Sequence, residues 1–84
     1  MTMKIVRKVA NDVHILNDKQ KIVVHLDSFI MSVTVDGRAY DVNNRGQVLD
    51  VWNYTTDENG QTIRPFADHA TGTMVNRAIA LALA

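Results

Sequence analysis

The sequence contains no cysteine, and this absence excludes several kinds of site at once. Disulfide bonds, thiolate zinc sites and a cysteine nucleophile are all ruled out. Small secreted domains are commonly held together by disulfides, so a chain of 84 residues without them favours a reducing, cytoplasmic compartment. The chain does not open with a basic region followed by an apolar segment, so we expect no signal peptide.

A net charge is also absent, because nine basic residues balance nine acidic ones. Residues 1–25 carry five Lys or Arg against two Asp, and residues 26–84 carry four against seven. Affinity for nucleic acid grows with the number of phosphates that a protein neutralises, and five basic residues are too few for a strong phosphate track. We expect them mainly to keep exposed strands soluble and unpaired. Nucleic acid is therefore an unlikely partner, and weak binding through the basic N-terminal strands is kept as an alternative function.

Two motifs of phosphate and acyl chemistry are missing as well. The four glycines are scattered beside turns or a helix start and do not form a phosphate-binding loop. Ser28 and Ser32 are the only serines, and neither lies in a glycine elbow of the kind that activates a nucleophilic serine. We expect no cofactor, no metal and no enzymatic activity.

The pattern that is present is a period-two alternation of apolar and polar residues from residue 3 to residue 66. Turn signals interrupt it at residues 17–18 (Asn-Asp), 36–37 (Asp-Gly) and 59–60 (Asn-Gly). The Asp-Gly pair is typical of a type I′ turn and would place Val33 opposite Tyr40. Five or six strands are predicted, drawn from residues 3–9, 12–16, 20–26, 29–35, 38–42, 48–55 and 61–66.

The spacing of apolar residues changes to three and four from Ala67, which predicts a helix over about 67–83. Gly72 weakens its first turns, so the helix could instead begin near Thr71 or Thr73. Asp68 at the start would suit the positive end of the helix dipole. The chain is thus predicted to be one α+β domain, residues 1–84, in which an antiparallel meander of five to six strands packs against one C-terminal α-helix.

The helix ends the chain in an apolar run, residues 78–84. Seven residues cannot cross a membrane, which needs about 20, and the helix has one basic residue, too few for a surface anchor. We expect the helix to cover the sheet through Met74, Ala78 and Leu81. Ile79 and Leu83 are then the predicted contacts of a homodimer, since an apolar helix face left in water invites association.

Two histidine–aspartate pairs are the only ingredients for catalysis. On strands, Asp12 and His14 would share a face, as would His25 and Asp27. Histidine beside a carboxylate is the basis of a general base or a metal site. This spacing is not specific, and a turn at residues 17–18 would set His14 against a lysine, a poor neighbour for a cation. A small enzyme that uses a His/Asp pair is kept as a second alternative.

Aromatic residues are few, and three of them gather with an arginine around the Asn-Gly turn at residues 59–60: Trp52, Tyr54, Arg64 and Phe66. Trp, Tyr and Arg dominate binding hot spots. The hairpin over 53–66 is long and polar, so its tip should project from the body as a contact element. These four residues are the predicted contacts of a non-catalytic protein-binding module. The alternative role for Trp52 is as the largest residue of the core.

In its size, its lack of cysteine and its lack of a catalytic constellation, the chain is similar to small phage-encoded accessory proteins. Many of these inhibit a host machine by occupying its surface, anti-CRISPR proteins among them. The likeness is one of class, and no particular residue carries it. It implies a small inhibitor or accessory protein that acts by steric occlusion of a host protein.

Overall fold

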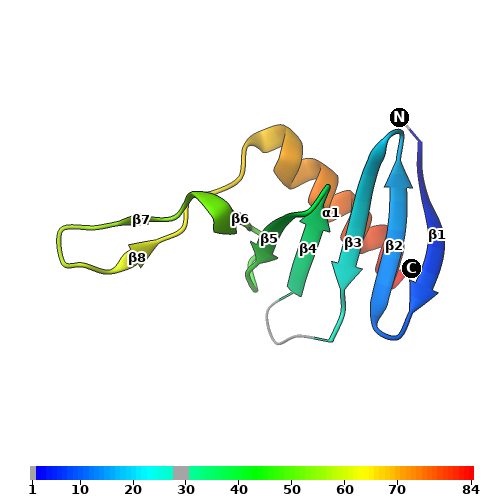
Figure 1. Ribbon diagram of the computed structural model, residues 1–84, viewed down its shortest axis with the longest axis horizontal. Helices are drawn as coiled ribbons and strands as arrows, with labels where there is room; N and C mark the ends of the chain where they lie inside the picture. Colours follow the sequence, from blue (N-terminus) through cyan, green and yellow to red (C-terminus); the bar gives the residue numbers. More distant parts are fainter. Residues whose placement is uncertain (1, 28–30) are drawn as a thin grey trace.

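The computed structural model describes residues 2–27 and 31–84, and it contains a six-stranded antiparallel sheet with one helix lying across one face (Figure 1). The spatial order of the strands is their order in the chain. The predicted α+β meander packed against a C-terminal helix is therefore confirmed. The strands are β1 (Met3–Val9), β2 (Asp12–Asn17), β3 (Gln20–His25), β4 (Met31–Val35), β5 (Arg38–Val42) and β6 (Val48–Asp50).

The β4–β5 hairpin has the register that its Asp-Gly turn predicts. Val33 lies opposite Tyr40 in the ladder. Asp36 has φ 49° and Gly37 has φ 84°, the two positive values that a type I′ turn requires. The first two residues of the predicted strand 29–35 lie outside the described residues.

The turn between β2 and β3 lies one residue later than predicted. Asn17 pairs with Gln20, so the loop is Asp18-Lys19 and not residues 17–18. Asn17 is only 3% exposed, because it continues the inward-facing alternation of β2. Burial therefore holds Asn17 in the strand, and Asp18 takes the positive φ of 54° in its place.

The helix α1 (His69–Leu83) begins at Asp68, which is its N-cap. The backbone N–H of Thr71 donates to the Asp68 carboxylate at 2.7 Å, and this bond lowers the pKa of the Asp68 carboxyl. The cap is thus Asp68, and the alternative starts at Thr71 or Thr73 are wrong. Among the described residues, no helix is long and apolar enough to span a membrane.

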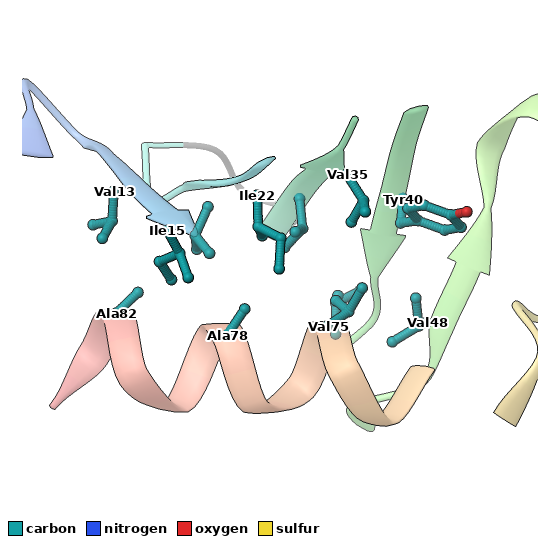
Figure 2. Close-up of a cluster of buried hydrophobic side chains, with 12 residues drawn as sticks. Val13, Ile15, Ile22, Val35, Tyr40, Val48, Val75, Ala78 and Ala82 are labelled. Carbon is teal, nitrogen blue, oxygen red and sulfur yellow. The ribbon is translucent and has the colours of Figure 1, made fainter. Parts of the chain in front are cut away.

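The core lies between α1 and the sheet face that it covers (Figure 2). The helix contributes Val75, Ala78 and Ala82 to it, and Leu81 packs against it as a partly buried residue. Two alanines on this face let the helix approach the sheet closely. Each aliphatic side chain that is fully buried contributes about 1.5–3 kcal/mol. The strands contribute Val13, Ile15, Ile22, Val24, Val33, Val35, Tyr40, Val42 and Val48.

After β6 the chain leaves the sheet and forms a projecting segment, residues 51–66, which we call the arm (Figure 1). It starts with a short 3-10 helix, η1 (Val51–Asn53), and continues as a separate two-stranded ladder of β7 (Thr55–Thr56) and β8 (Thr62–Ile63). The molecule measures 44 × 25 × 22 Å. The prediction that this hairpin projects from the body is confirmed.

The predicted strand over 48–55 is wrong beyond Asp50. The carboxylate of Asp50 accepts the backbone N–H of Trp52 at 3.0 Å and the side-chain amide of Asn53 at 2.6 Å. These bonds favour a helical turn over an extended strand. The predicted return strand over 61–66 is likewise shorter, with β8 followed by an isolated bridge from Phe66 to Leu49 on β6.

Candidate functional site

The aromatic residues of the arm are exposed. The exposed fraction is 60% for Trp52, 61% for Tyr54 and 66% for Phe66. The alternative in which Trp52 fills the core is therefore wrong, because the turn at Asp50 takes Trp52 out of the sheet. Ile63 on β8 is also 46% exposed. Four large apolar side chains thus meet water on one short segment, which is the pattern of an interaction surface.

The ladder of the arm places two of the predicted contact residues level with each other. Thr55 pairs with Ile63, so Tyr54 and Arg64 stand one step further along the two strands, at the same height of the hairpin. Phe66 lies nearer the body, bridged to Leu49 at the edge of the sheet. Trp52 is held separately in η1. The structure therefore brings Tyr54 and Arg64 together, with Phe66 and Trp52 at the base of the arm.

An ion pair ties the arm to the sheet. The guanidinium of Arg64 donates to the Asp41 carboxylate on β5 at 2.6 Å, across 23 positions of sequence. The side chains of Arg64 and Asp41 are 45% and 21% exposed. The energy of so exposed a pair is small, and it adds to the backbone bonds from Asp50 to Pro65 and from Ala67 to Val48 that hold the base of the arm on the body. A guanidinium has five N–H donors, so the pairing leaves Arg64 able to bind a partner as well.

A hollow of about 590 Å³ lies at the base of the arm. Apolar side chains of Met31, Val42 and Leu49 line it, together with the pair of Asp41 and Arg64. A concave apolar surface with a few polar groups is typical of a binding site, and Arg64 connects this hollow with the arm. The arm and this hollow form the candidate contact site.

The arm and its flanks, residues 50–68, carry negative charge. They contain four acidic residues and one basic residue, a net charge of −3. The basic residues Lys4, Arg7 and Lys8 lie on β1, at the far end of the long axis (Figure 1). The exposed rings of the arm are thus surrounded by charge that repels phosphate.

The tip of the arm has a defined geometry. The carboxylate of Asp57 accepts the backbone N–H groups of Asn59 and Gln61, each at 2.9 Å. Gly60 takes a positive φ of 77° within the same turn. The predicted hairpin is therefore confirmed, but its loop is residues 57–61 and not the two-residue turn Asn59-Gly60, because Thr56 pairs with Thr62 and the side chain of Asp57 binds the backbone of the loop.

Asp12 and His14 share the partly exposed face of β2 as predicted, and Asp27 lies beyond the end of β3, but the side-chain pair that the structure shows is a different one. In the β2–β3 ladder Asp12 lies directly opposite His25, and the two side chains are 2.9 Å apart. His14 faces Val23 and not Lys21, because the turn between these strands begins one residue later than predicted. A two-residue turn at residues 18–19 would have predicted from the sequence that Asp12 lies opposite His25. Among the described residues, no three groups are placed to hold a metal ion.

The two predicted dimer residues differ in exposure. Leu83 is 62% exposed, whereas Ile79 is partly buried and packs against the core. Leu83 is therefore the residue of the pair that α1 offers to the surface. The homodimer itself stays a prediction.

No protein-family model, curated protein or solved structure matches this chain. The likeness to phage accessory proteins therefore stays an expectation from size and composition. Function is therefore inferred from the exposed residues and their geometry.

Proposed function

We propose that this protein is a protein-binding module whose arm is the contact element and takes no part in catalysis. The observation that carries the proposal is that Trp52, Tyr54 and Phe66 are each at least 60% exposed on a segment that projects from the body. Such rings bury much surface on binding at little cost in side-chain entropy. A partner protein that covers them would remove a large apolar area from water.

The charge of the arm favours a protein over a nucleic acid. Exposed rings can stack on bases, but single-stranded nucleic acids are bound in positively charged grooves. Residues 50–68 carry a net charge of −3, so this surface repels phosphate. In a salt titration with mixed-sequence DNA, we expect no binding even at low salt. Tight binding that weakens as salt is added would favour the alternative, the basic N-terminal strands.

The contact element is organised before binding. Asp57 holds the tip, and the pair of Arg64 and Asp41 holds the base. An element that is already ordered loses less entropy on association. The body behind the arm then obstructs access to whatever surface the arm occupies. The protein would act by steric occlusion, as a small phage-type inhibitor or accessory protein of a host protein, and the lack of cysteine supports a cytoplasmic location.

The test compares two double variants. Trp52→Ala/Tyr54→Ala removes exposed rings from the arm, and Val6→Ala/Val9→Ala removes exposed side chains from β1, where Val6 is 54% and Val9 is 47% exposed. Each protein is immobilised and exposed to a bacterial lysate, after its thermal unfolding has been matched to the wild type. We expect one set of host proteins to be captured by the wild type and the β1 variant and lost by the arm variant. Equal capture by the arm variant would overturn the proposal.

A photo-crosslinker then locates the contact. A benzophenone amino acid placed at Tyr54 should form adducts with the captured protein, and the same group placed at Val9 should form none. Adducts from position 9 alone would move the contact surface to β1. Arg64→Ala should weaken binding of the identified partner while leaving the fold intact.

A further inference from the structure

Three polar side chains form a hydrogen-bonded chain on the sheet face that α1 leaves uncovered, which we call the outer face. His25 Nδ1 lies 2.9 Å from an Asp12 carboxylate oxygen, and His25 Nε2 lies 3.0 Å from the Thr34 hydroxyl oxygen. The three residues come from the adjacent strands β2, β3 and β4. Ser32 lies between His25 and Asp41, the anchor of Arg64, in one cross-strand row, and none of the three hydrogen-bonded residues is among the proposed partner contacts.

The direction of each hydrogen bond follows from the chemistry of the groups. An ionised carboxylate can only accept, so the bond to Asp12 requires that His25 Nδ1 carry the proton. In a neutral imidazole the other nitrogen is then an acceptor, and the Thr34 hydroxyl donates to Nε2. A hydroxyl that donates to an imidazole, which in turn donates to a carboxylate, is the arrangement that activates a nucleophile.

The strands hold this arrangement in place and leave it accessible. Asp12 is the direct cross-strand neighbour of His25, and Thr34 is opposite Val23, two residues before His25. The sheet thus fixes all three Cα positions. The side chains of His25 and Asp12 are 30% and 38% exposed, so a small molecule can reach the three hydrogen-bonded side chains from solvent.

We propose that Thr34 is the nucleophile of an acyl-transfer site for small activated esters. The Thr34 oxygen attacks the ester carbonyl carbon while His25 Nε2 takes the hydroxyl proton. The tetrahedral adduct then expels the alcohol, and an acyl group remains on Thr34. The alcohol takes the proton from Nε2, or it leaves as its anion and Nε2 releases its proton to solvent, so that Nε2 is again free to act as a base. A water molecule, deprotonated by Nε2, attacks that acyl group and releases the carboxylic acid and the free hydroxyl.

The surroundings of Thr34 limit the substrate class. Strands β3 and β4 each have a neighbour on both sides, so their backbone N–H groups are engaged in hydrogen bonds between strands. They therefore supply no preformed pocket for a developing oxyanion. Ser32, which lies opposite His25, is a side-chain donor about 7 Å along the strand from Thr34. With so little stabilisation available for the tetrahedral adduct, the site can act only on esters whose leaving group departs easily. Aryl esters are therefore the class that this site can use.

The test uses p-nitrophenyl acetate as the probe. The release of p-nitrophenolate and the site of acetylation are measured together, the second by peptide mass mapping. Thr34→Val removes the hydroxyl and keeps the branched shape, whereas Thr34→Ser restores a hydroxyl. We expect acetyl on Thr34, about a tenfold or greater loss of rate in Thr34→Val, and recovery in Thr34→Ser.

Two results would overturn the proposal. One is an unchanged rate in Thr34→Val, which would mean that an imidazole reacts alone. The other is acetylation confined to lysines or to the N-terminus. His14→Gln is the matched control, because it removes the other histidine of the outer face and should leave the rate unchanged. The outcome is independent of the arm, since the Trp52→Ala/Tyr54→Ala variant should keep the esterase rate whether or not it binds a partner.

Asp12 acts as a positioning residue in this scheme, through the tautomer of His25. In Asp12→Asn the amide can donate to Nδ1 and favour the tautomer that carries its proton on Nε2. Nitrogen NMR of the imidazole reads the tautomer directly. We expect the signal of His25 to shift towards that form as the rate falls. A lower rate with an unchanged tautomer would contradict the role given to Asp12.

Discussion

The body and the arm use apolar residues in opposite ways. In the body, alternate residues of the strands bury their side chains against α1, and Ile22, Val24 and Val33 have no exposed surface. In the arm, Trp52, Tyr54 and Phe66 are among the most exposed large side chains. The same chain therefore holds one set of apolar residues for folding and another for contact with a partner.

The two regions also differ in what holds them together. The body depends on packing that involves every strand of the large sheet. The arm has strands of two residues each, and its ends are shaped by backbone N–H groups that donate to the carboxylates of Asp50 and Asp57. A segment with little buried surface opens at low free energy, while the body unfolds as a unit. Changes in the arm should thus leave global unfolding almost untouched.

The largest expected contrast is between two isoleucines. Ile22 is fully buried and Ile63 is 46% exposed. Ile22→Ala should lower the free energy of unfolding by about 2–5 kcal/mol, because it removes buried surface and leaves a cavity. Ile63→Ala should change it by about 0.5 kcal/mol or less. Urea denaturation followed by circular dichroism measures both.

Comparable losses of unfolding free energy in Ile22→Ala and Ile63→Ala would contradict the distinction between the body and the arm. They would show that the arm unfolds together with the body. The arm would then be part of the cooperative unit, and the exposed rings would need a structural explanation.

Much of the body could be predicted from the sequence because its signals are local. Alternation gave the strands, and the Asp-Gly pair fixed the register of Val33 and Tyr40. The arm was harder, since the turn at Asp50 depends on a side-chain bond that competes with strand formation. Nothing in the local pattern indicates the pair of Arg64 and Asp41, which are distant in sequence.

Errors of a single residue had large effects on the predicted polar sites. Moving the β2–β3 turn by one residue exchanges the cross-strand neighbours of every side chain. That shift replaces Lys21 by Val23 opposite His14 and sets Asp12 against His25. The cause was the burial of Asn17, a polar residue that alternation alone does not assign to the core.

The second contrast concerns two glycines with the same backbone constraint. Gly37 in the body has φ 84° and Gly60 in the arm has φ 77°, and around each an added Cβ would meet open space. A valine at either position is strained by its backbone and not by a clash. Gly37→Val should lower the free energy of unfolding by more than about 1 kcal/mol. Gly60→Val should open the arm locally and leave the denaturation midpoint of the body unchanged.

Proteolysis followed in parallel sharpens the glycine comparison. Gly60→Val should speed cleavage within residues 51–66, whereas Gly37→Val should not affect the arm selectively. A Gly37→Val protein as stable as the wild type would show that the type I′ turn does not constrain the β4–β5 hairpin.

A third contrast concerns two capping aspartates. The pKa of Asp68 is lowered chiefly by the backbone N–H of Thr71, so its stabilising effect is full above the ordinary range of an aspartate pKa. It is lost as the pH falls through the lowered value. Asp68→Ala should therefore lower the thermal midpoint at neutral pH, by an amount that vanishes in strong acid. Asp68→Asn keeps a cap without a titrating group, so the stabilisation by the asparagine cap should not depend on pH, and the difference from the wild type should shrink as the pH falls.

The matching change in the arm is Asp57→Ala, which removes bonds to the backbone N–H groups of Asn59 and Gln61. It should leave the thermal midpoint unchanged at every pH. A loss of midpoint from Asp57→Ala as large as that from Asp68→Ala would contradict the view that the arm folds apart from the body.

The smallest expected effect on stability concerns the end of the chain, where the body itself has an exposed apolar residue. Leu83 is 62% exposed, and a lysine near a helix C-terminus is favoured by the helix dipole. Leu83→Lys should therefore not lower the stability of a monomer. Ile79→Lys is the matched control, and it should lower stability because Ile79 packs against the core.

The mass in solution shows whether Leu83 lies in a homodimer interface. If two copies pair through α1, Leu83→Lys sets like charges close together across a symmetric interface, and the protein becomes a folded monomer of 9.4 kDa. Light scattering over a range of concentrations measures this. A wild type that has the monomer mass throughout that range would end the dimer prediction. Leu83 would then be a single exposed side chain, which soluble proteins tolerate, and the arm would hold the only large group of exposed apolar residues in the described part of the chain.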